Sequence, residues 1–390
     1  MRILQVTPYF APAWAYGGPP RVMFDYAVGL ARRGHEVDVL TTDVLDGKRR
    51  ATPRDEVLDG VRVLRLPNVS NSLAWRTKKY QPRGLVSRLA REIGRYDIVH
   101  VTDTRTALTA ATYVAARTRN VALCLSAHGS LPSSAGVRGV VKRIYDAALV
   151  RPMMERAALL LAQTEHEARL YASFGAVADR IRLLPLPVGL DQVPEFREAG
   201  KFRRCLALDV RVRVILFLGR INRLKGLDLL IEAVAPLLDE RTVLVVVGRD
   251  DGQLGEIVER FRSHLDDGRI RLVGPLYGAD RFAAYADADV FCLTPRHYEE
   301  TSVAALEAAA CGTPIVVSEQ SDIPGLAASG GGHVVPLEPS AIAAAVAETL
   351  ERGAEMGRAA QDLVRRQHDR DTVVKLLERY LSDAVDRRSA

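Results

Sequence analysis

The chain has 390 residues, of which 48% are hydrophobic and 26% charged, and this composition excludes a disordered polypeptide. Its length is typical of two domains rather than one. Four scattered cysteines without a CxxC pair exclude a disulfide-stapled scaffold and are typical of reduced thiols in a cytosol. No apolar run approaches the ~18 residues of a membrane span, so we expect a cytoplasmic protein that is soluble or at most peripheral to a membrane.

The formal net charge of +6 is divided unequally along the chain. Residues 1–190 hold 28 Lys and Arg against 16 Asp and Glu, whereas the remaining residues hold 26 against 32. The basic first half is either a solvated surface or a part that meets something anionic, such as a membrane surface, a lipid phosphate or an acidic glycan.

Short apolar runs alternate with helical stretches along the whole chain. In the first half the apolar runs cover residues 2–8, 36–42, 61–67, 97–103 and 121–129. A polar stretch follows residue 190, and the alternation restarts with apolar runs at residues 212–220, 242–249, 270–275, 289–295 and 314–319. Strands that alternate with helices predict parallel βαβ units.

The predicted fold class is therefore α/β, with two Rossmann-like, doubly wound parallel sheets that face a cleft. We place the first domain at residues 1–190, an interdomain linker at 191–210 and the second domain at 211–370. Residues 371–390 contain a last helix that we expect to pack back on the first domain. Ligands of open α/β sheets bind at the carboxyl ends of the strands, so the loops there hold the candidate residues.

Two candidates lie in the first half. Gly17 and Gly18 precede a helix opened by prolines, where a backbone without side chains can approach an anionic or sugar group; the alternative is an ordinary turn. The pair is not GxGxxG, so the dinucleotide fingerprint of a dehydrogenase is missing. His128 ends a predicted strand and is expected to face the cleft, whereas the alternative is a structural histidine.

Two cations are the candidates in "GRINRLKG" of the second half. Arg220 ends an apolar run, and Lys225 comes five residues later, directly before Gly226 and a helix. Cations beside a strand end and a helix N-terminus suit a diphosphate, whose charge they can neutralise. The alternative is a pair of solvated surface cations.

Two carboxylates eight residues apart form the last candidate pair. Glu299 lies in a loop before a predicted helix that begins at Thr301 or Ser302 and ends at Gly312. Glu307 lies inside that helix among small apolar residues, where an unpaired carboxylate is costly. The sequence offers no obvious protein partner for it, so we interpret both glutamates as binding-site residues.

These motifs together resemble the retaining glycosyltransferases of the GT-B fold, specifically family 4, the glycosyl transferases group 1. The resemblance covers nearly the whole chain, from the Gly-Gly loop through "AHG" and "LPVGLD" to "GRINRLKGLDLLIEA" and "EETSVAALEAAACGTPIVVS". The last two blocks are the most specific, because they occur in the family's order and spacing. The resemblance implies an acceptor-side first domain and a second domain that binds a nucleotide sugar.

The resemblance also implies a role for each candidate. Glu307 would accept hydrogen bonds from ribose hydroxyls, Glu299 would contact hydroxyls of the donor sugar, and His128 would orient that sugar. Arg220 and Lys225 would hold the diphosphate and stabilise the leaving nucleoside diphosphate. The predicted catalytic residues are His128, Arg220, Lys225 and Glu299. Further residues expected to line the donor are Gly17, Gly18, Gly274, Leu276, Thr301, Ser302 and Val303.

The implied reaction moves a hexose from a nucleotide-diphosphate sugar to a hydroxyl of a glycan or lipid-linked acceptor, with retention of the anomeric configuration, in cell-surface polysaccharide or glycoconjugate synthesis. A donor phosphate oxygen can take the acceptor's proton, so no protein base, cofactor or metal is expected, and we interpret "RDD" at residues 249–251 as a loop. Nucleic acid is not an expected partner. The alternatives are a sugar-nucleotide epimerase or hydrolase, a phosphorylase, and a non-catalytic nucleotide-sugar-binding protein of the same fold.

The sequence departs from the family's pattern in two places. The family often has E-G-F-G where this chain has "EETS" at residues 299–302, and the loss of both glycines bears on the pose and identity of the donor sugar. The family's P-N-G-V-D segment is "PVGLD" at residues 187–191, which we interpret as a structural change.

The segment 71–93 carries a further prediction, because it mixes Trp75 and Tyr80 with several cations. Aromatic rings beside cations suit an anionic membrane, where the rings lie at headgroup level. We therefore expect contact with the inner membrane face, next to a lipid-linked acceptor. The alternatives are a loop for a soluble acceptor and a plain solvated surface.

Overall fold

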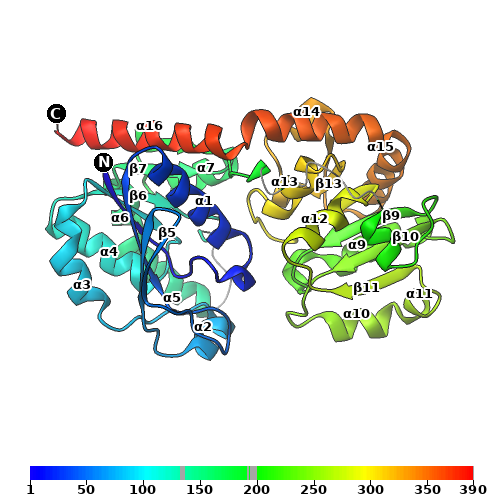
Figure 1. Ribbon diagram of the computed structural model, residues 1–390, viewed down its shortest axis with the longest axis horizontal. Helices are drawn as coiled ribbons and strands as arrows, with labels where there is room; N and C mark the ends of the chain where they lie inside the picture. The colour runs from blue at the N-terminus through cyan, green and yellow to red at the C-terminus, as the bar shows by residue number, and fades with distance from the viewer. Residues whose placement is uncertain (132–136, 191–192, 194–199, 390) are drawn as a thin grey trace. The chain divides into compact units, whose positions relative to one another are not determined.

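The computed structural model describes residues 1–131, 137–190, 193 and 200–389, and it divides into two compact units (Figure 1). Unit 1 comprises Met1–Pro187 together with Arg370–Ala390, and unit 2 comprises Val188–Asp369.

The boundary between the units lies before the expected linker at 191–210, part of which falls outside the described residues. The rest of that segment includes a short helix, α8 (Lys201–Cys205), that belongs to unit 2. The amides of Gly200 and Phe202 each donate a 2.7 Å hydrogen bond to the carboxylate of Asp287. These bonds fix the segment to the body of unit 2, because Asp287 directly follows a helix of that unit.

Unit 1 is built on a sheet that has eight strands in the described part of the chain, in the order β3-β4-β2-β1-β5-β6-β7-β8. All neighbours are parallel except β3, which is antiparallel to β4. The strands are β1 (Arg2–Val6), β2 (Glu36–Thr42), β3 (Asp55–Leu58), β4 (Val61–Leu66), β5 (Ile98–Thr102), β6 (Ala122–Ser126), β7 (Leu159–Ala162) and β8 (Ile181–Leu183). The five predicted runs correspond to β1, β2, β4, β5 and β6, whereas β3, β7 and β8 are not predicted.

Helices cover both faces of this sheet. They are α1 (Gly18–Arg32), α2 (Asn71–Thr77), α3 (Leu85–Glu92), α4 (Ala107–Thr118), α5 (Val137–Tyr145), α6 (Arg151–Arg156), α7 (Glu165–Ser173) and α16 (Arg370–Ser389). Helices α1 and α16 pack against each other, as do α3 and α4 (Figure 1). Every residue of β5 and β6 is buried, as expected for parallel strands covered on both sides.

The last helix, α16, belongs to unit 1 although it follows unit 2 in the chain. It approaches α1 so closely that a Cβ atom at Gly29 would lie 2.5 Å from a methyl group of Val374. Glu378 of α16 accepts hydrogen bonds from Arg33 and from His35, the latter at 2.8 Å. A glycine and an ion pair thus fix α16 onto the body of unit 1.

The aromatic residues of segment 71–93 point inward, which contradicts their expected exposure at a membrane. Trp75 is half-buried and its ring lies 5.0 Å from that of Tyr16, while Tyr80 is only 2% exposed. The ammonium of Lys78 lies 5.2 Å from the ring centroids of Trp75 and Tyr16. The rings of Trp75 and Tyr80 therefore pack in the core of unit 1. Within the described ranges, no helix is long and apolar enough to cross a bilayer.

Unit 2 contains a parallel sheet with six described strands in the order β11-β10-β9-β12-β13-β14. The strands are β9 (Arg213–Leu218), β10 (Thr242–Val247), β11 (Ile270–Gly274), β12 (Val290–Leu293), β13 (Ile315–Ser318) and β14 (Gly332–Val335). The five predicted runs correspond to β9 through β13, and only the four-residue β14 is not predicted. The α/β class with two doubly wound sheets is thus confirmed.

The helices of unit 2 surround this sheet. They are α8, α9 (Leu227–Val234), α10 (Leu254–Arg260), α11 (Arg262–Asp266), α12 (Ala279–Ala286), α13 (Val303–Ala310), α14 (Leu326–Ser329) and α15 (Pro339–Gln367). The long helix α15 packs against α9 and α13 and against β13 and β14. The strand order reverses between β9 and β12, and this switch point is where open α/β sheets bind ligands.

Candidate functional site

The loops after β9, β10 and β12 meet at the carboxyl edge of unit 2 because two glycines allow close backbone contact. A Cβ atom at Gly226 would lie 2.0 Å from the carbonyl oxygen of Thr294, and Gly226 has a φ of +66°. A Cβ atom at Gly248 would lie 1.8 Å from the carbonyl oxygen of Gly219. Any side chain at these two positions would push the loops apart, so the glycines fix the geometry of the candidate site.

Arg220 lies in the loop after β9 and is paired with Asp251. Its Nη1 donates a 2.8 Å bond to Oδ2 of Asp251, and Asn222 donates to the same oxygen at 2.9 Å. Asn222 also accepts from the amide of Lys225 at 3.2 Å, which holds the loop in a short 3-10 turn. The sequence analysis missed Asp251 as the counterion of Arg220, because it interpreted "RDD" only as a loop.

The neighbouring acid of that loop, Asp250, has a structural role. Its Oδ1 accepts hydrogen bonds from the amides of Gly252, Gln253 and Leu254, at 2.8, 3.2 and 3.1 Å, at the start of α10. The described residues contain no group of three or more His, Cys, Asp or Glu side chains arranged to share a metal ion.

Lys225 and Glu299 are brought together from opposite sides of the switch point. The Nζ of Lys225, in the loop after β9, lies 2.6 Å from Oε2 of Glu299, in the loop after β12. Both side chains are mostly buried, with exposed fractions of 16% and 21%. An ammonium has three N–H donors, so two of those on Lys225 remain available for a ligand.

The residue after Glu299 has the backbone conformation of a glycine. Glu300 has a φ of +59° and is only 2% exposed. A left-handed conformation at a residue other than glycine costs about 1–3 kcal/mol. The turn that the family often builds with glycine therefore persists here despite the substitution, and the peptide of Glu299 is still held by its 2.8 Å bond to the carbonyl of Gln320.

Glu307 has a protein partner, which contradicts its interpretation as an unpaired carboxylate. Arg281 of α12 donates to both of its oxygens, at 2.9 Å from Nε and 2.8 Å from Nη2, and Tyr285 donates at 3.2 Å. Arg281 and Glu307 are 6% and 7% exposed. Burial lowers the pKa of Arg281, but the hydrogen bonds and charge of Glu307 outweigh it and raise the pKa above its usual value. The helix spacing of Arg281 and Tyr285 places both on one face of α12.

Further predicted donor residues lie on the same edge of unit 2. Ser302 caps α13 through a 3.5 Å bond from the amide of Ala305, and Val303 is the first residue of that helix. Thr301 is instead turned away toward the backbone carbonyl of Asp322, to which its hydroxyl donates at 3.2 Å.

Gly274 is the last residue of the edge strand β11, and Leu276 follows that strand. Gly274 has a φ of +83° and its carbonyl accepts a 2.9 Å bond from the amide of Gly248, which ties it to the loop after β10. Leu276 is half-buried in the loop that leads to α12. Both positions are thus on the carboxyl edge of the sheet.

His128 follows β6 in unit 1 and carries a neutral imidazole at pH 7, because burial lowers its pKa to about 4. Its Nδ1 lies 2.6 Å from Nε2 of Gln163, and its Nε2 is buried without a hydrogen-bond partner among the described residues. With the Gln163 amide as donor, the ring carries its proton on Nε2. That N–H is buried and unsatisfied within the part of the chain that the structure describes.

A buried carboxylate holds the loop of His128 in place. Glu167 accepts from the amides of Gly129 and Gln163, at 3.0 and 2.9 Å. Thr164 caps α7, the helix that contains Glu167, because its hydroxyl oxygen accepts a 3.1 Å hydrogen bond from the amide of Glu167. The sequence analysis missed Glu167, although the T-x-x-E spacing of Thr164 and Glu167 is the signal of a capping box that could have indicated it.

Gly17 and Gly18 lie at the start of α1 in unit 1. Gly17 has a φ of +97°, a conformation that favours glycine, and a Cβ atom there would meet no atom within 4 Å. Gly18 opens the helix, but the next two residues, Pro19 and Pro20, have no N–H group. The backbone can therefore approach a ligand closely, while two of the four N-terminal amide donors are missing.

Models of known protein families match both units. The model described as Glycosyl transferases group 1 matches residues 212–352, and the model described as Glycosyl transferase 4-like domain matches residues 17–187. The D-inositol 3-phosphate glycosyltransferase of Acidothermus cellulolyticus is 29% identical over 396 residues, which cover 93% of this chain and 84% of the relative. The enzyme of the same description from Gordonia bronchialis is 31% identical over 384 residues, covering 88% and 79%.

The solved structure of HepE from Anabaena in complex with UDP has a TM-score of 0.77 to this chain. The two sequences are 18% identical, and the alignment covers 98% of this chain and 100% of HepE. This likeness confirms the GT-B architecture expected from the sequence motifs.

Removal of the Glu307 carboxylate should destabilise unit 2. Glu307→Ala leaves the Arg281 guanidinium buried without its counterion, so we expect a loss of about 3–5 kcal/mol in the free energy of unfolding. Urea denaturation followed by circular dichroism measures this loss, and the double variant Arg281→Met/Glu307→Leu should recover much of it. A midpoint of Glu307→Ala equal to that of the parent would contradict the importance of the pair.

The low pKa of His128 predicts that unit 1 loses stability in acid. Between pH 6.5, where an unfolded histidine titrates, and about pH 4, the unfolded chain binds a proton that the folded chain does not. This contribution to stability is complete above pH 6.5 and declines as the pH falls toward 4. Thermal denaturation at pH 7 and pH 5 should therefore show a smaller loss for His128→Gln than for the parent, whereas the exposed His297→Gln should behave like the parent.

Proposed function

Because this chain belongs to the glycosyl transferases group 1, family 4 of the GT-B enzymes, we propose that it transfers a hexose from a nucleotide-diphosphate sugar to an acceptor hydroxyl with retention of the anomeric configuration. The observation that carries this proposal is the 2.6 Å bond between Lys225 and Glu299 at the switch point of unit 2. It joins a cation that can bind a diphosphate to a carboxylate that can accept sugar hydroxyls.

The diphosphate is bound by donors that the protein itself leaves unused. Lys225 donates one of its N–H groups to Glu299. Arg220 donates from one guanidinium nitrogen to Asp251, and its side chain is 38% exposed. The remaining N–H groups converge on the leaving diphosphate and stabilise its developing negative charge. With two cations there, the reaction needs no metal ion.

Glu307 has fewer free hydrogen-bond acceptor sites for the ribose than the sequence suggests. A carboxylate offers about four lone-pair sites, and Arg281 and Tyr285 occupy three of them. One acceptor site is left for a ribose hydroxyl. The two hydrogen bonds from Arg281 fix the orientation of the Glu307 carboxylate. Glu307 is thus a binding residue whose partners orient it.

The transfer proceeds on one face of the donor sugar. The bond between C1 and the diphosphate oxygen breaks while the acceptor oxygen bonds to C1 on the same face, and the acceptor proton passes to a phosphate oxygen. The peptide of Glu299, held by Gln320, sets the position of the sugar.

The relatives suggest which substrates to test. HepE is solved with UDP-glucose as well as with UDP, which makes UDP-glucose the first donor of choice. The names of the relatives indicate a phosphorylated cyclitol as one acceptor class, and the excess of cations in residues 1–190 suits any acceptor that carries phosphate. A lipid-linked or glycan acceptor of cell-surface synthesis remains part of this proposal.

Donor binding should raise the thermal stability of the protein. UDP-glucose at a hundred times its dissociation constant adds about 2.7 kcal/mol to the free energy of unfolding. We expect Lys225→Ala to abolish this shift, whereas Arg223→Ala, a 77% exposed cation of the same loop that pairs with Glu256, should keep it. UDP-, GDP- and ADP-glucose are compared by differential scanning fluorimetry.

Two outcomes would count against this assignment. A shift of equal size in Lys225→Ala and in the parent would remove Lys225 from the donor site. Release of free glucose from the donor, with no transfer to any acceptor, would favour a sugar-nucleotide hydrolase instead.

We also propose that unit 1 contacts an anionic membrane, with α5 as its apolar anchor in place of the buried rings of segment 71–93. Val140, Val141 and Ile144 of α5 are 45%, 65% and 67% exposed, and the exposed Arg143 lies beside them. An apolar helix face next to cations suits a bilayer with negative headgroups. Such contact would bring the enzyme to a lipid-linked acceptor.

Vesicle binding should depend on α5. Co-sedimentation with anionic vesicles at low salt should fall strongly in Val141→Asp/Ile144→Asp, because two carboxylates would be placed against the headgroups. Val114→Asp, at a 52% exposed valine of α4, is the matched control and should bind like the parent. Equal binding to neutral and anionic vesicles would exclude the membrane from this proposal.

A further inference from the structure

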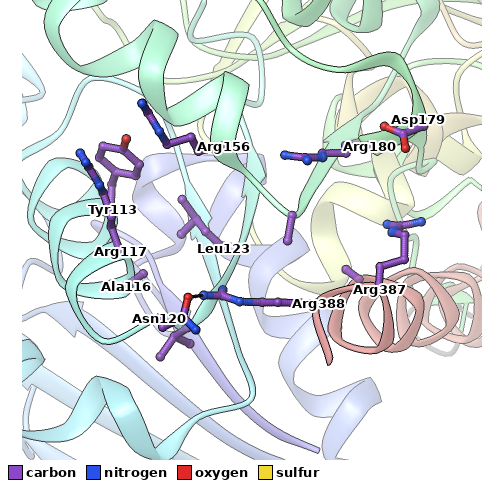
Figure 2. A pocket seen from close by; sticks show the side chains of 13 residues that line it. Tyr113, Ala116, Arg117, Asn120, Leu123, Arg156, Asp179, Arg180, Arg387 and Arg388 are labelled. Atoms are coloured by element: carbon purple, nitrogen blue, oxygen red, sulfur yellow. Dashed lines mark hydrogen bonds between the residues drawn. The ribbon is translucent and has the colours of Figure 1, made fainter. Parts of the chain in front are cut away.

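A cavity of about 420 Å³ lies within unit 1, away from its candidate site (Figure 2). Val121, Ala158 and Arg180 line it, and these residues directly precede β6, β7 and β8. The cavity is therefore at the amino ends of parallel strands, whereas His128 follows the carboxyl end of β6. The five residues of that strand separate the two places by roughly 17 Å.

The cavity is strongly basic. Its lining includes five arginines from separate parts of the chain: Arg117 of α4, Arg156 of α6, Arg180 before β8, and Arg387 and Arg388 of α16. Asp179 is the one acid among the described residues that line it. Figure 2 shows the side chains of Arg180 and Arg388 extending into the space between α4 and α16.

These guanidinium groups have no carboxylate partners within the described ranges. Arg388 donates to the side-chain oxygen of Asn120, and Arg180 donates to the carbonyls of Glu155 and Ala157 at 3.2 and 3.3 Å. Burial lowers the pKa of Arg388, as expected for a cation without a neighbouring acid. Arg180 is partly buried, whereas the other four arginines are exposed at the rim.

Helix ends explain part of this arrangement but not all of it. Arg117, Arg156, Arg387 and Arg388 lie in the last turns of their helices, where cations complement the negative end of the helix dipole. That effect acts on each helix separately and places no requirement on where the side chains meet. It does not account for a shared cavity, nor for Arg180, which belongs to a 3-10 turn.

The wall of the cavity also has an aromatic and an apolar part. Tyr113 of α4 is 6% exposed, and its hydroxyl has no hydrogen-bond partner among the described residues. The hydroxyl oxygen is itself fully buried, so it is not exposed to the cavity. The adjoining Leu123, Ala116 and Ala384 give the wall an apolar part as well.

We propose that this cavity binds a small soluble molecule that carries two phosphate groups. Arginine matches phosphate oxygens with two parallel N–H donors, and five arginines against one acid provide charge for two phosphates. The volume suits a small organic molecule, whose carbon part would contact Leu123. This site is independent of the proposed sugar transfer.

A ligand bound in the cavity would stabilise the end of the last helix, α16. Arg387 and Arg388 are at the end of α16, while the other three arginines belong to α4, α6 and the segment before β8. A bound bisphosphate joins these elements through one molecule. We expect it to add to the contacts that already hold the end of α16, which packs on β6 and β7 and donates a bond from Arg388 to Asn120.

Calorimetric titration with sodium pyrophosphate tests the site. The titrated protein is the full chain with Lys225→Ala, which removes the proposed diphosphate site of unit 2. We expect Arg117→Gln/Arg156→Gln in this background to weaken pyrophosphate binding at least tenfold. The matched control is Arg76→Gln/Arg91→Gln, which removes two arginines from the last turns of α2 and α3 outside the cavity.

Hydrogen exchange gives a second readout on the same proteins. Pyrophosphate should slow amide exchange in the last two turns of α16 in the control variant but not in Arg117→Gln/Arg156→Gln. Equal pyrophosphate affinity in the two double variants, or no binding to the Lys225→Ala protein, would overturn the proposal.

A membrane lipid is the other source of clustered phosphate, and a separate arm distinguishes it. Phosphatidylcholine vesicles that contain phosphatidic acid should bind both double variants alike. If vesicle binding instead depends on Arg117 and Arg156 while pyrophosphate gives no heat, the cavity recognises a lipid headgroup and the soluble ligand is excluded.

Discussion

Parallel pairing of β9 with both β10 and β12 is the constraint on which the candidate site of unit 2 depends. Strands that run in the same direction end at the same edge, so the loops that follow them converge wherever the strand order reverses. Lys225 and Glu299 are 74 residues apart in the chain, yet they share a 2.6 Å bond there. The glycines at 226 and 248 allow the loops to approach, because any Cβ atom would strike a neighbouring carbonyl.

Charge in unit 2 is largely balanced within the protein before any ligand binds. Arg220 is paired with Asp251, Lys225 with Glu299, and Arg281 with Glu307. Burying ions in pairs limits the cost of desolvation, and the N–H groups left over on the cations still give a preorganised site for an anion. The arginine-lined cavity of unit 1 is different, since no carboxylate among the described residues pairs with its cations and most of them are exposed.

Two of the described non-glycine residues with a left-handed backbone belong to the candidate site. Glu300 and His128 are not glycines, yet both have φ values in the left-handed region, at +59° and +48°. Each is held by its surroundings: the peptide before Glu300 bonds to Gln320, and the loop of His128 is fixed by Glu167. The strain is therefore compensated by buried hydrogen bonds close to it.

The sequence by itself determined the α/β class, the two-unit organisation and the positions of ten strands, because apolar runs and their spacing are local properties of the chain. It also singled out Lys225, Glu299 and Glu307 through their unusual settings. It did not reveal β3, β7, β8 or β14, although β12 and β13, which are also four residues long, were predicted from the apolar runs around them.

Only the tertiary structure decided which groups satisfy one another. The sequence could not show that Arg281, 26 residues before Glu307, neutralises it, since that contact depends on how α12 packs on α13. Nor could it show that Trp75 and Tyr80 turn into the core, because the sequence of a short helix does not say which face its neighbours cover. The arginine cavity is the clearest case: its residues come from four separate segments, and only the return of α16 to unit 1 brings them around one space.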